Sequence, residues 1–170
     1  MSSDAVVIVA AKRSPLGAFQ GSLSGASSPD LAAAAIRACI EESAIDANAI
    51  SEVLIGCVLP AGVGQAPARQ AAIKAGIPLS AGCTTLNKVC GSGMKTTMLG
   101  NDLIKAGSAG IVVSGGMESM SNAPYLMPKA RSGYRMGHQE VLDHMFFDGL
   151  EDAAGGCSTR SARAVRFDGP

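Results

Sequence analysis

The chain has 170 residues, in which 14 Lys and Arg residues balance 14 Asp and Glu residues. A chain without net charge has no general electrostatic attraction to nucleic acid or to an anionic membrane, so neither is expected as a partner. Hydrophobic residues make up 47% and charged residues only 16%, which is typical of a tightly packed α/β domain. No apolar run is long enough to span a bilayer.

Four apolar stretches predict buried β-strands. They are residues 5–10, 53–59, 84–89 and 111–114. The predicted strands alternate with helical segments, which indicates a parallel sheet with right-handed crossovers and helices that cover it. In such sheets the reactive groups lie beyond the carboxyl ends of the strands.

Helix starts and stops are marked by capping residues. Ser28 is the expected N-cap of a first helix, with Pro29 at its first helical position. Pro67 is expected to open a second helix. A third helix is predicted from Met94 onward, with Gly107 as its C-terminal cap.

Cys90 lies where the predicted strand 84–89 meets the third helix, and Gly91 and Gly93 allow close backbone approach there. The first turn of a helix presents unpaired N–H groups and the positive end of the helix dipole. These groups stabilise a thiolate and can hold a developing oxyanion, so Cys90 is a candidate nucleophile. A small buried cysteine packed beside glycines remains the alternative.

The other cysteines indicate neither a disulfide framework nor a metal site, because the chain contains no CxxC pair and no His at ligand spacing from a Cys. The five cysteines are Cys39, Cys57, Cys83, Cys90 and Cys157. The N-terminal stretch MSSDAVVIVAAKRSP also lacks the pattern of a signal peptide, since an acid precedes its short apolar run. A cytoplasmic location is therefore expected.

Three further polar residues could act as a base for Cys90. His138 and His144 are the only histidines, and either could act as its base, although surface or interface histidines are the favoured interpretation. Glu118 follows a predicted strand. A carboxylate that orders the turn through backbone N–H groups is favoured there over a general base.

The glycines of residues 61–69, AGVGQAPAR, resemble a dinucleotide-binding fingerprint only superficially. The third glycine and the distant acid are missing, so a Rossmann site is not expected. Gln65 and Arg69 are instead expected to order the loop near Cys90.

The composition changes after Ser121. Residues 122–149 are richer in Met, charge and aromatic side chains, and they are predicted to leave the sheet, with a short helix at 141–147. Residues 154–170 are Arg- and Ser-rich without a period, and a disordered tail is expected.

Three segments, NKVCGSGMK, GGMESMSNAPY and RMGHQEVLDHMFFDGLEDA, closely resemble the thiolase family, of the acetyl-CoA acetyltransferase type. The resemblance covers about residues 4–153. It implies an α/β thiolase-like fold, namely the N-terminal half of a layered αβαβα architecture. By this resemblance residues 1–120 are the N-terminal thiolase domain. Residues 121–153 begin a loop domain that covers coenzyme A and carries tetramer contacts, and residues 154–170 are an aberrant tail.

The resemblance also implies a chemistry. Cys90 would accept an acyl group from an acyl-CoA thioester, and a second acetyl-CoA would attack that group to give a 3-ketoacyl-CoA, or the steps would run backwards as thiolysis. The Cys90 backbone N–H would contribute to an oxyanion hole, and Leu150 would line the coenzyme A pocket. No metal or organic cofactor is implied, because coenzyme A thioesters are substrates, and the full-length form would be a homodimer or homotetramer.

Two departures from the family pattern leave alternative interpretations of the chain open. Full-length members are more than twice as long, and their second half supplies a catalytic His and a second Cys, whose motifs do not occur here. After DGLEDA the chain reads AGGCSTRSARAVRFDGP, for which a frameshift, a truncated gene and a fragment are all open. The chain is therefore expected not to complete the catalytic cycle alone. The alternatives are an inactive remnant or a partner subunit of a full-length thiolase, and a ketoacyl-synthase-like condensing enzyme.

Overall fold

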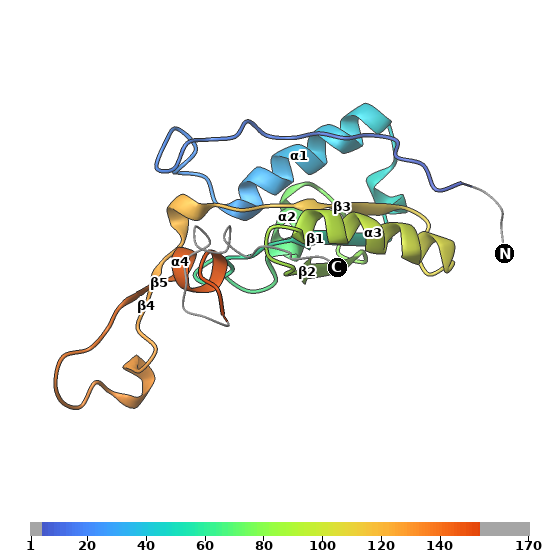
Figure 1. Ribbon diagram of the computed structural model, residues 1–170. Helices are drawn as coiled ribbons and strands as arrows, with labels where there is room; N and C mark the ends of the chain where they lie inside the picture. The colour runs from blue at the N-terminus through green and yellow to red at the C-terminus, as the bar shows by residue number, and fades with distance from the viewer. Residues whose placement is uncertain (1–4, 154–170) are drawn as a thin grey trace, which may run out of the picture.

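The structure is a computed structural model that describes residues 5–153, and a parallel three-stranded sheet lies at its centre (Figure 1). The strands are β1 (Glu52–Gly56), β2 (Gly82–Leu86) and β3 (Val112–Gly116), in the order β2-β1-β3. In the register, Leu54 of β1 lies opposite Thr84 of β2 and Ser114 of β3. The predicted parallel pairing is confirmed.

Helices cover both faces of this sheet. The helices are α1 (Ser28–Ser43), α2 (Pro67–Lys74) and α3 (Ser92–Lys105). The β1–β2 crossover and the β2–β3 crossover run in opposite directions across the sheet, so right-handed connections place α2 and α3 on opposite faces. α1 packs on α2, whereas α3 packs on β3 and β1.

The main core lies between the sheet and the layer formed by α1 and α2. Small residues such as Ala33 of α1 and Ala71 of α2 meet Val53 and Ile55 of β1 there. Small side chains allow the two helices to approach each other closely, because there is little bulk between their backbones.

The predicted helix caps are confirmed, except that the N-cap of α1 lies one residue earlier than expected. Ser27, not Ser28, caps α1, and its Oγ accepts from the Asp30 N–H at 3.3 Å, while the Ser28 side chain is buried. Two adjacent serines have the same capping chemistry, so the sequence does not distinguish them. α2 begins at Pro67 as predicted, and Gly107 follows α3 with φ 72° as a left-handed cap.

The prediction of a buried strand at residues 5–10 is wrong. The segment forms no strand, and the Ile8 side chain is 80% exposed. Figure 1 shows the segment running past α1, outside the three-stranded sheet, and an ion pair joins Lys12 to Glu42 of α1. A wholly apolar strand needs cover on both faces, and among residues 5–153 nothing supplies that cover here.

Residues after β3 leave the main sheet, as predicted. A separate two-stranded antiparallel sheet pairs β4 (Tyr125–Leu126) with β5 (Leu142–Asp143), and it projects beyond the carboxyl end of β3 in Figure 1. The short helix α4 (His144–Gly149) starts later than the predicted 141–147, because Leu142 and Asp143 pair with β4 and the Asp143 carboxylate caps the helix.

Short 3-10 turns complete the described chain, at Ala47–Ala49, Met120–Asn122 and Ala130–Ser132. No helix within residues 5–153 combines the length and the apolar character needed to cross a membrane. The predicted tail, residues 154–170, lies outside the described residues.

Three glycines bring the start of α3 against the ends of β1 and β3. A Cβ on Gly56 would lie 2.5 Å from the Ser92 Cβ, and a Cβ on Gly93 would lie 3.3 Å from the Gly116 nitrogen. Contacts of 2.5 Å between carbon atoms are sterically forbidden, so only glycine permits this approach at position 56. The glycines therefore fix where α3 begins relative to the sheet.

Replacement of Gly56 by Ala is expected to destabilise the chain by about 2 kcal/mol, because overpacking forces α3 away from β1. Urea unfolding followed by circular dichroism measures the loss. Gly115→Ala in the neighbouring strand β3 is the matched control, because a Cβ at position 115 would meet nothing within 4 Å. Equal losses in both variants would contradict the close-approach argument.

Candidate active site

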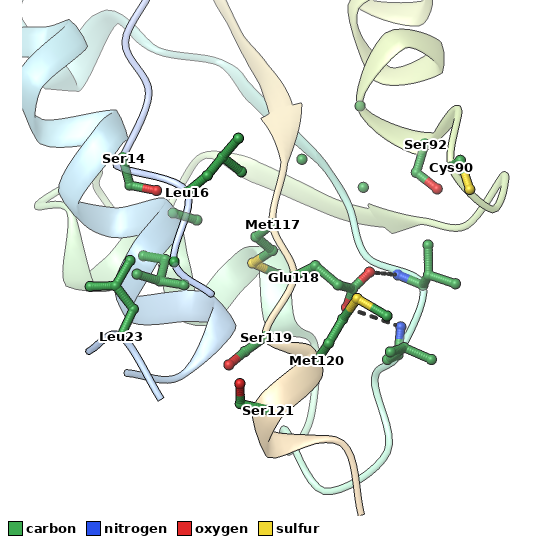
Figure 2. A pocket seen from close by; sticks show the side chains of 18 of the residues that line it. Ser14, Leu16, Leu23, Cys90, Ser92, Met117, Glu118, Ser119, Met120 and Ser121 are labelled. Atoms are coloured by element: carbon green, nitrogen blue, oxygen red, sulfur yellow. Dashed lines mark hydrogen bonds between the residues drawn. The ribbon is translucent and has the colours of Figure 1, made fainter. Parts of the chain in front are cut away.

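A cleft of about 690 Å³ opens at the carboxyl ends of β1 and β3 (Figure 2). Its walls come from residues 12–19, from residues 116–121, from the start of α3 and from the end of α4. Cys90 and Leu150, the two residues that the sequence predicted to be functional, both line it. The fold thus brings together two positions that are far apart in the chain, at the end of the sheet where reactive groups are expected.

Cys90 is accessible in this cleft. It precedes Gly91, the N-cap of α3, and it is exposed, whereas Cys57 is buried and Cys39 and Cys83 are partly buried. Figure 2 shows the Cys90 and Ser92 side chains at the start of α3. The alternative of a buried structural cysteine is therefore wrong for Cys90.

The turn that carries Cys90 is strained. The Gly91 N–H donates to the Lys88 carbonyl at 3.1 Å and closes a tight turn, in which Val89 has a φ of 45°. Left-handed backbone costs a β-branched residue about 1–3 kcal/mol, and such strain persists only where the surroundings enforce it. Asn87 contributes to this, because its Oδ1 accepts from the Val89 N–H at 2.9 Å.

Ser92 also holds this turn, a role that the sequence did not reveal. Its Oγ accepts from the Lys88 N–H at 2.8 Å and donates to the Val89 carbonyl at 2.6 Å. Serine and asparagine side chains commonly bond nearby backbone groups in turns. That tendency was the available signal for Ser92 and Asn87, but the strained residue between them is not visible in sequence.

Glu118 orders the loop after β1, as predicted. Its carboxylate accepts from the Val58 N–H at 2.8 Å and from the Leu59 N–H at 3.2 Å, the two bonds drawn in Figure 2. The Cys57 thiol donates to the same carboxylate at 3.6 Å. Burial, and secondly the Glu118 charge, raise the pKa of Cys57 to about 11, so this thiol stays protonated at neutral pH.

Neither histidine lies in the cleft lining. His144 is only 4% exposed, its Nε2 accepts from the Ala61 N–H at 3.3 Å, and its Nδ1 bonds to Asp148 at 2.5 Å. The interpretation of His144 as a surface or interface residue is therefore wrong, because the ring pins α4 to the loop after β1. His138 is exposed between β4 and β5, as a surface histidine would be.

The prediction for Gln65 and Arg69 is also wrong. Arg69 donates to the Leu79 carbonyl at 3.3 Å, and neither residue lines the cleft. The loop after β1 is instead held by Gln70, whose Nε2 donates to the carbonyls of Val63 and Gln65 at 3.0 and 2.9 Å. Gln70 was missed because helical position alone does not reveal that its amide reaches back.

Leu150 ends α4 and faces the same cleft as Cys90. Its backbone N–H donates to the Phe146 carbonyl at 3.0 Å, and its side chain is partly buried.

Within residues 5–153, no group of three or more His, Cys, Asp and Glu side chains is arranged to hold a metal ion.

Alkylation of the native chain by iodoacetamide at neutral pH is expected to modify Cys90 well before Cys57. The thiolate is the reactive species, so modification of Cys57 should rise only as the pH approaches its raised pKa of about 11. Peptide mass spectrometry measures both sites. Cys90→Ser is the control and should leave the Cys57 rate unchanged; equal rates at both sites at neutral pH would refute the assignment.

Comparisons with known proteins agree with this architecture. The family model described as "Thiolase, N-terminal domain" matches residues 6–165. The chain is 56% identical to an acetyl-CoA acetyltransferase from Pseudomonas aeruginosa over 148 residues, which cover 87% of this chain and 38% of that protein. It is 51% identical to acetyl-CoA acetyltransferase 1 from Arabidopsis thaliana over 147 residues, covering 86% of this chain and 35% of that one.

A solved structure is similar as well. The Acat5 thiolase from Ascaris suum, crystallised in complex with coenzyme A, matches with a TM-score of 0.85 and 39% sequence identity, over 88% of this chain and 39% of that chain. The predicted thiolase-like α/β fold is thereby confirmed. The chain spans less than two-fifths of the length of these relatives. The chain belongs to the thiolase family, and the part of that family's fold that it contains is the N-terminal domain.

Proposed function

We propose that this chain belongs to an acetyl-CoA C-acetyltransferase in which Cys90 accepts the acyl group of a coenzyme A thioester. The observation that carries the proposal is an exposed cysteine at the start of α3, in a cleft of about 690 Å³. The names of the relatives, acetyl-CoA acetyltransferases and a thiolase in complex with coenzyme A, support the reaction class and the substrate.

In the first step the Cys90 thiolate attacks the thioester carbonyl. A carbon–sulfur bond forms, the carbonyl oxygen takes the negative charge, and the coenzyme A thiolate then leaves and is protonated. No side chain caps the start of α3, and the backbone N–H of Cys90 lies beside that helix end. The Cys90 N–H and the helix dipole would stabilise the oxyanion. The product is an S-acyl cysteine.

In the second step a carbanion formed from acetyl-CoA attacks the S-acyl group, and the Cys90 thiolate leaves to give a 3-ketoacyl-CoA such as acetoacetyl-CoA. Thiolysis, the reverse of these steps, belongs to fatty acid breakdown. Removal of the α-proton needs a base. By family resemblance that base and its partner belong to the second half of a full-length thiolase. Within the described residues neither histidine lines the cleft, which supports this division of work.

Leu150, which lies far from Cys90 in the sequence but lines the same cleft, is proposed to contact coenzyme A. In this proposal residues 1–120 are the N-terminal thiolase domain and residues 121–153 begin the loop domain that covers coenzyme A. The full-length form would be a cytoplasmic homodimer or homotetramer, with its tetramer contacts in the loop domain. Coenzyme A thioesters would be the only small molecules required.

A second candidate function is that of a partner subunit. The outer face of α3 carries Met94, 74% exposed, and Met98 one turn later, also exposed. Exposed apolar side chains at this spacing form one face and favour association with another chain. Native mass spectrometry of the chain, alone and mixed with the Pseudomonas aeruginosa relative, would detect such a complex, and a persistent monomer would count against it.

Incubation of the 170-residue chain with radiolabelled acetyl-CoA is expected to acetylate Cys90, because its thiol is the exposed nucleophile of the cleft. Tryptic mapping locates the label. Cys90→Ala should abolish it, whereas Cys39→Ser, which removes a partly buried thiol in α1, should not. A label that persists in Cys90→Ala would refute the proposal.

Condensation by this chain alone is expected to be negligible, because among residues 5–153 neither histidine lines the cleft, and the Glu118 carboxylate in its wall already accepts from the Val58 and Leu59 N–H groups. The measurement is the rate at which acetyl-CoA is converted to acetoacetyl-CoA, monitored by the absorbance of acetoacetyl-CoA in the presence of magnesium. Turnover at an ordinary enzymatic rate, about 1–1000 per second, would contradict the expected dependence on a second half.

A further inference from the structure

Val89, directly before Cys90, is held in a conformation that its own side chain does not favour. Its φ is 45°, and two substituents on its Cβ make this region sterically costly. The Val89 side chain is 51% exposed, so burial does not compensate for the strain. Interactions of neighbouring residues must therefore keep the backbone of this turn in place.

Ser92 makes the interactions that bracket the turn. Its hydroxyl accepts from the Lys88 N–H at 2.8 Å on one side of the strained peptide and donates to the Val89 carbonyl at 2.6 Å on the other. The Ser92 residue is only 4% exposed, so water does not compete readily for these bonds. A broken bond would leave the buried hydroxyl unsatisfied.

The position of Ser92 is itself fixed by the sheet. Its Cβ packs so closely on Gly56 that a methyl group there would overlap it at 2.5 Å. Ser92 is the first residue of α3, and its hydroxyl reaches back to the turn. The N-cap itself is Gly91, which has no side chain. The Ser92 hydroxyl thus connects the turn that carries Cys90 to a residue whose position is fixed by the sheet.

We propose that Ser92 is a positioning residue for the thiol of Cys90. Its hydroxyl holds residues 88–91 in the strained turn and so presents the Cys90 sulfur to an acyl donor in the cleft. The acyl donor rests on the function proposed above, whereas the hold on the turn does not. Loss of the hydroxyl should let Val89 relax, which moves Cys90 while the remainder of the fold persists.

Ser92→Ala is the test variant, and Thr96→Val is its matched control. Thr96 lies one turn later on the same face of α3, is fully buried, and bonds the carbonyls of Gly93 and Gly115 through its hydroxyl. Both variants remove a buried hydroxyl from one helix. Urea unfolding of each variant measures the shared structural cost, and only Ser92→Ala should affect Cys90.

The first readout is amide hydrogen exchange of the native chain, resolved by residue with NMR. Ser92→Ala should accelerate exchange at the Lys88 amide by about tenfold or more beyond any change at Leu54 in β1, which reports the global loss of stability. Thr96→Val should leave Lys88 protected. This readout needs no substrate, so it tests the hold on the turn even if acetyl-CoA does not acylate the wild type. An unchanged Lys88 amide in Ser92→Ala would overturn the proposal.

The second readout compares two reactions of Cys90. Single-turnover acylation by acetyl-CoA should slow by about 10- to 100-fold in Ser92→Ala, because a misplaced nucleophile loses its approach geometry. Alkylation by iodoacetamide, which needs only an accessible thiol, should change less than about threefold. A wild-type chain that is not acylated would refute the proposed function, whereas equal acylation of the wild type and Ser92→Ala would refute the positioning role.

The third readout tests the strain directly with Val89→Gly. Glycine adopts positive φ without penalty, so the turn should no longer depend on the Ser92 hydroxyl. Ser92→Ala should then slow acylation by less than about threefold in the Val89→Gly background, and the same double-mutant cycle applies to Lys88 exchange. An undiminished effect of Ser92→Ala in that background would overturn the role of strain.

Discussion

The close approach of the α3 backbone to the ends of β1 and β3 is the constraint on which the site depends. Gly56, Gly93 and Gly116 remove the side chains that would otherwise keep helix and sheet apart. Ordinary packing distances would place the start of α3 farther from the sheet, and Cys90, two residues before the helix, would move with it. The position of Cys90 is therefore a consequence of missing side chains at three other positions.

Around this contact, the walls of the cleft are tied together by hydrogen bonds from the segment after β3. Glu118 holds the loop after β1, and Ser119 and Asn122 donate to the Ala26 carbonyl at 3.1 Å each, which fixes the chain before α1. Ser121 accepts from the Gln20 N–H at 2.8 Å. One short polar segment therefore links the loop after β1 to the stretch 20–26 before α1, two parts of the chain that are far apart in the sequence.

Patterns that depend on local chemistry were predictable. Apolar runs between helix caps located the central strands, Pro67 marked α2, and the strand-to-helix junction located Cys90. Patterns that depend on partners were not. The apolar run at residues 5–10 predicted burial, but burial requires a second surface, which a single segment does not specify. His144 was likewise misjudged, because one of its two partners, the Ala61 N–H, is 83 residues away in the sequence.

Site residues divided in the same way. Cys90 followed from its place at a helix start, and Glu118 from the known preference of carboxylates for backbone N–H groups after a strand. Leu150 needed the family resemblance, because an isolated leucine carries no chemical signal. Ser92 and Asn87 escaped prediction, since their hydrogen bonds depend on the left-handed backbone of Val89, which a valine gives no reason to expect.

The methionine pair on the outer face of α3 gives the chain a sensitivity of its own. Thioethers adapt to irregular apolar partners, so Met94 and Met98 suit a surface that is covered by another element. Oxidation to sulfoxides would make the same surface polar. Both residues are mostly exposed, so such damage would weaken the packing of α3 against an apolar neighbour and spare the sheet beneath the helix.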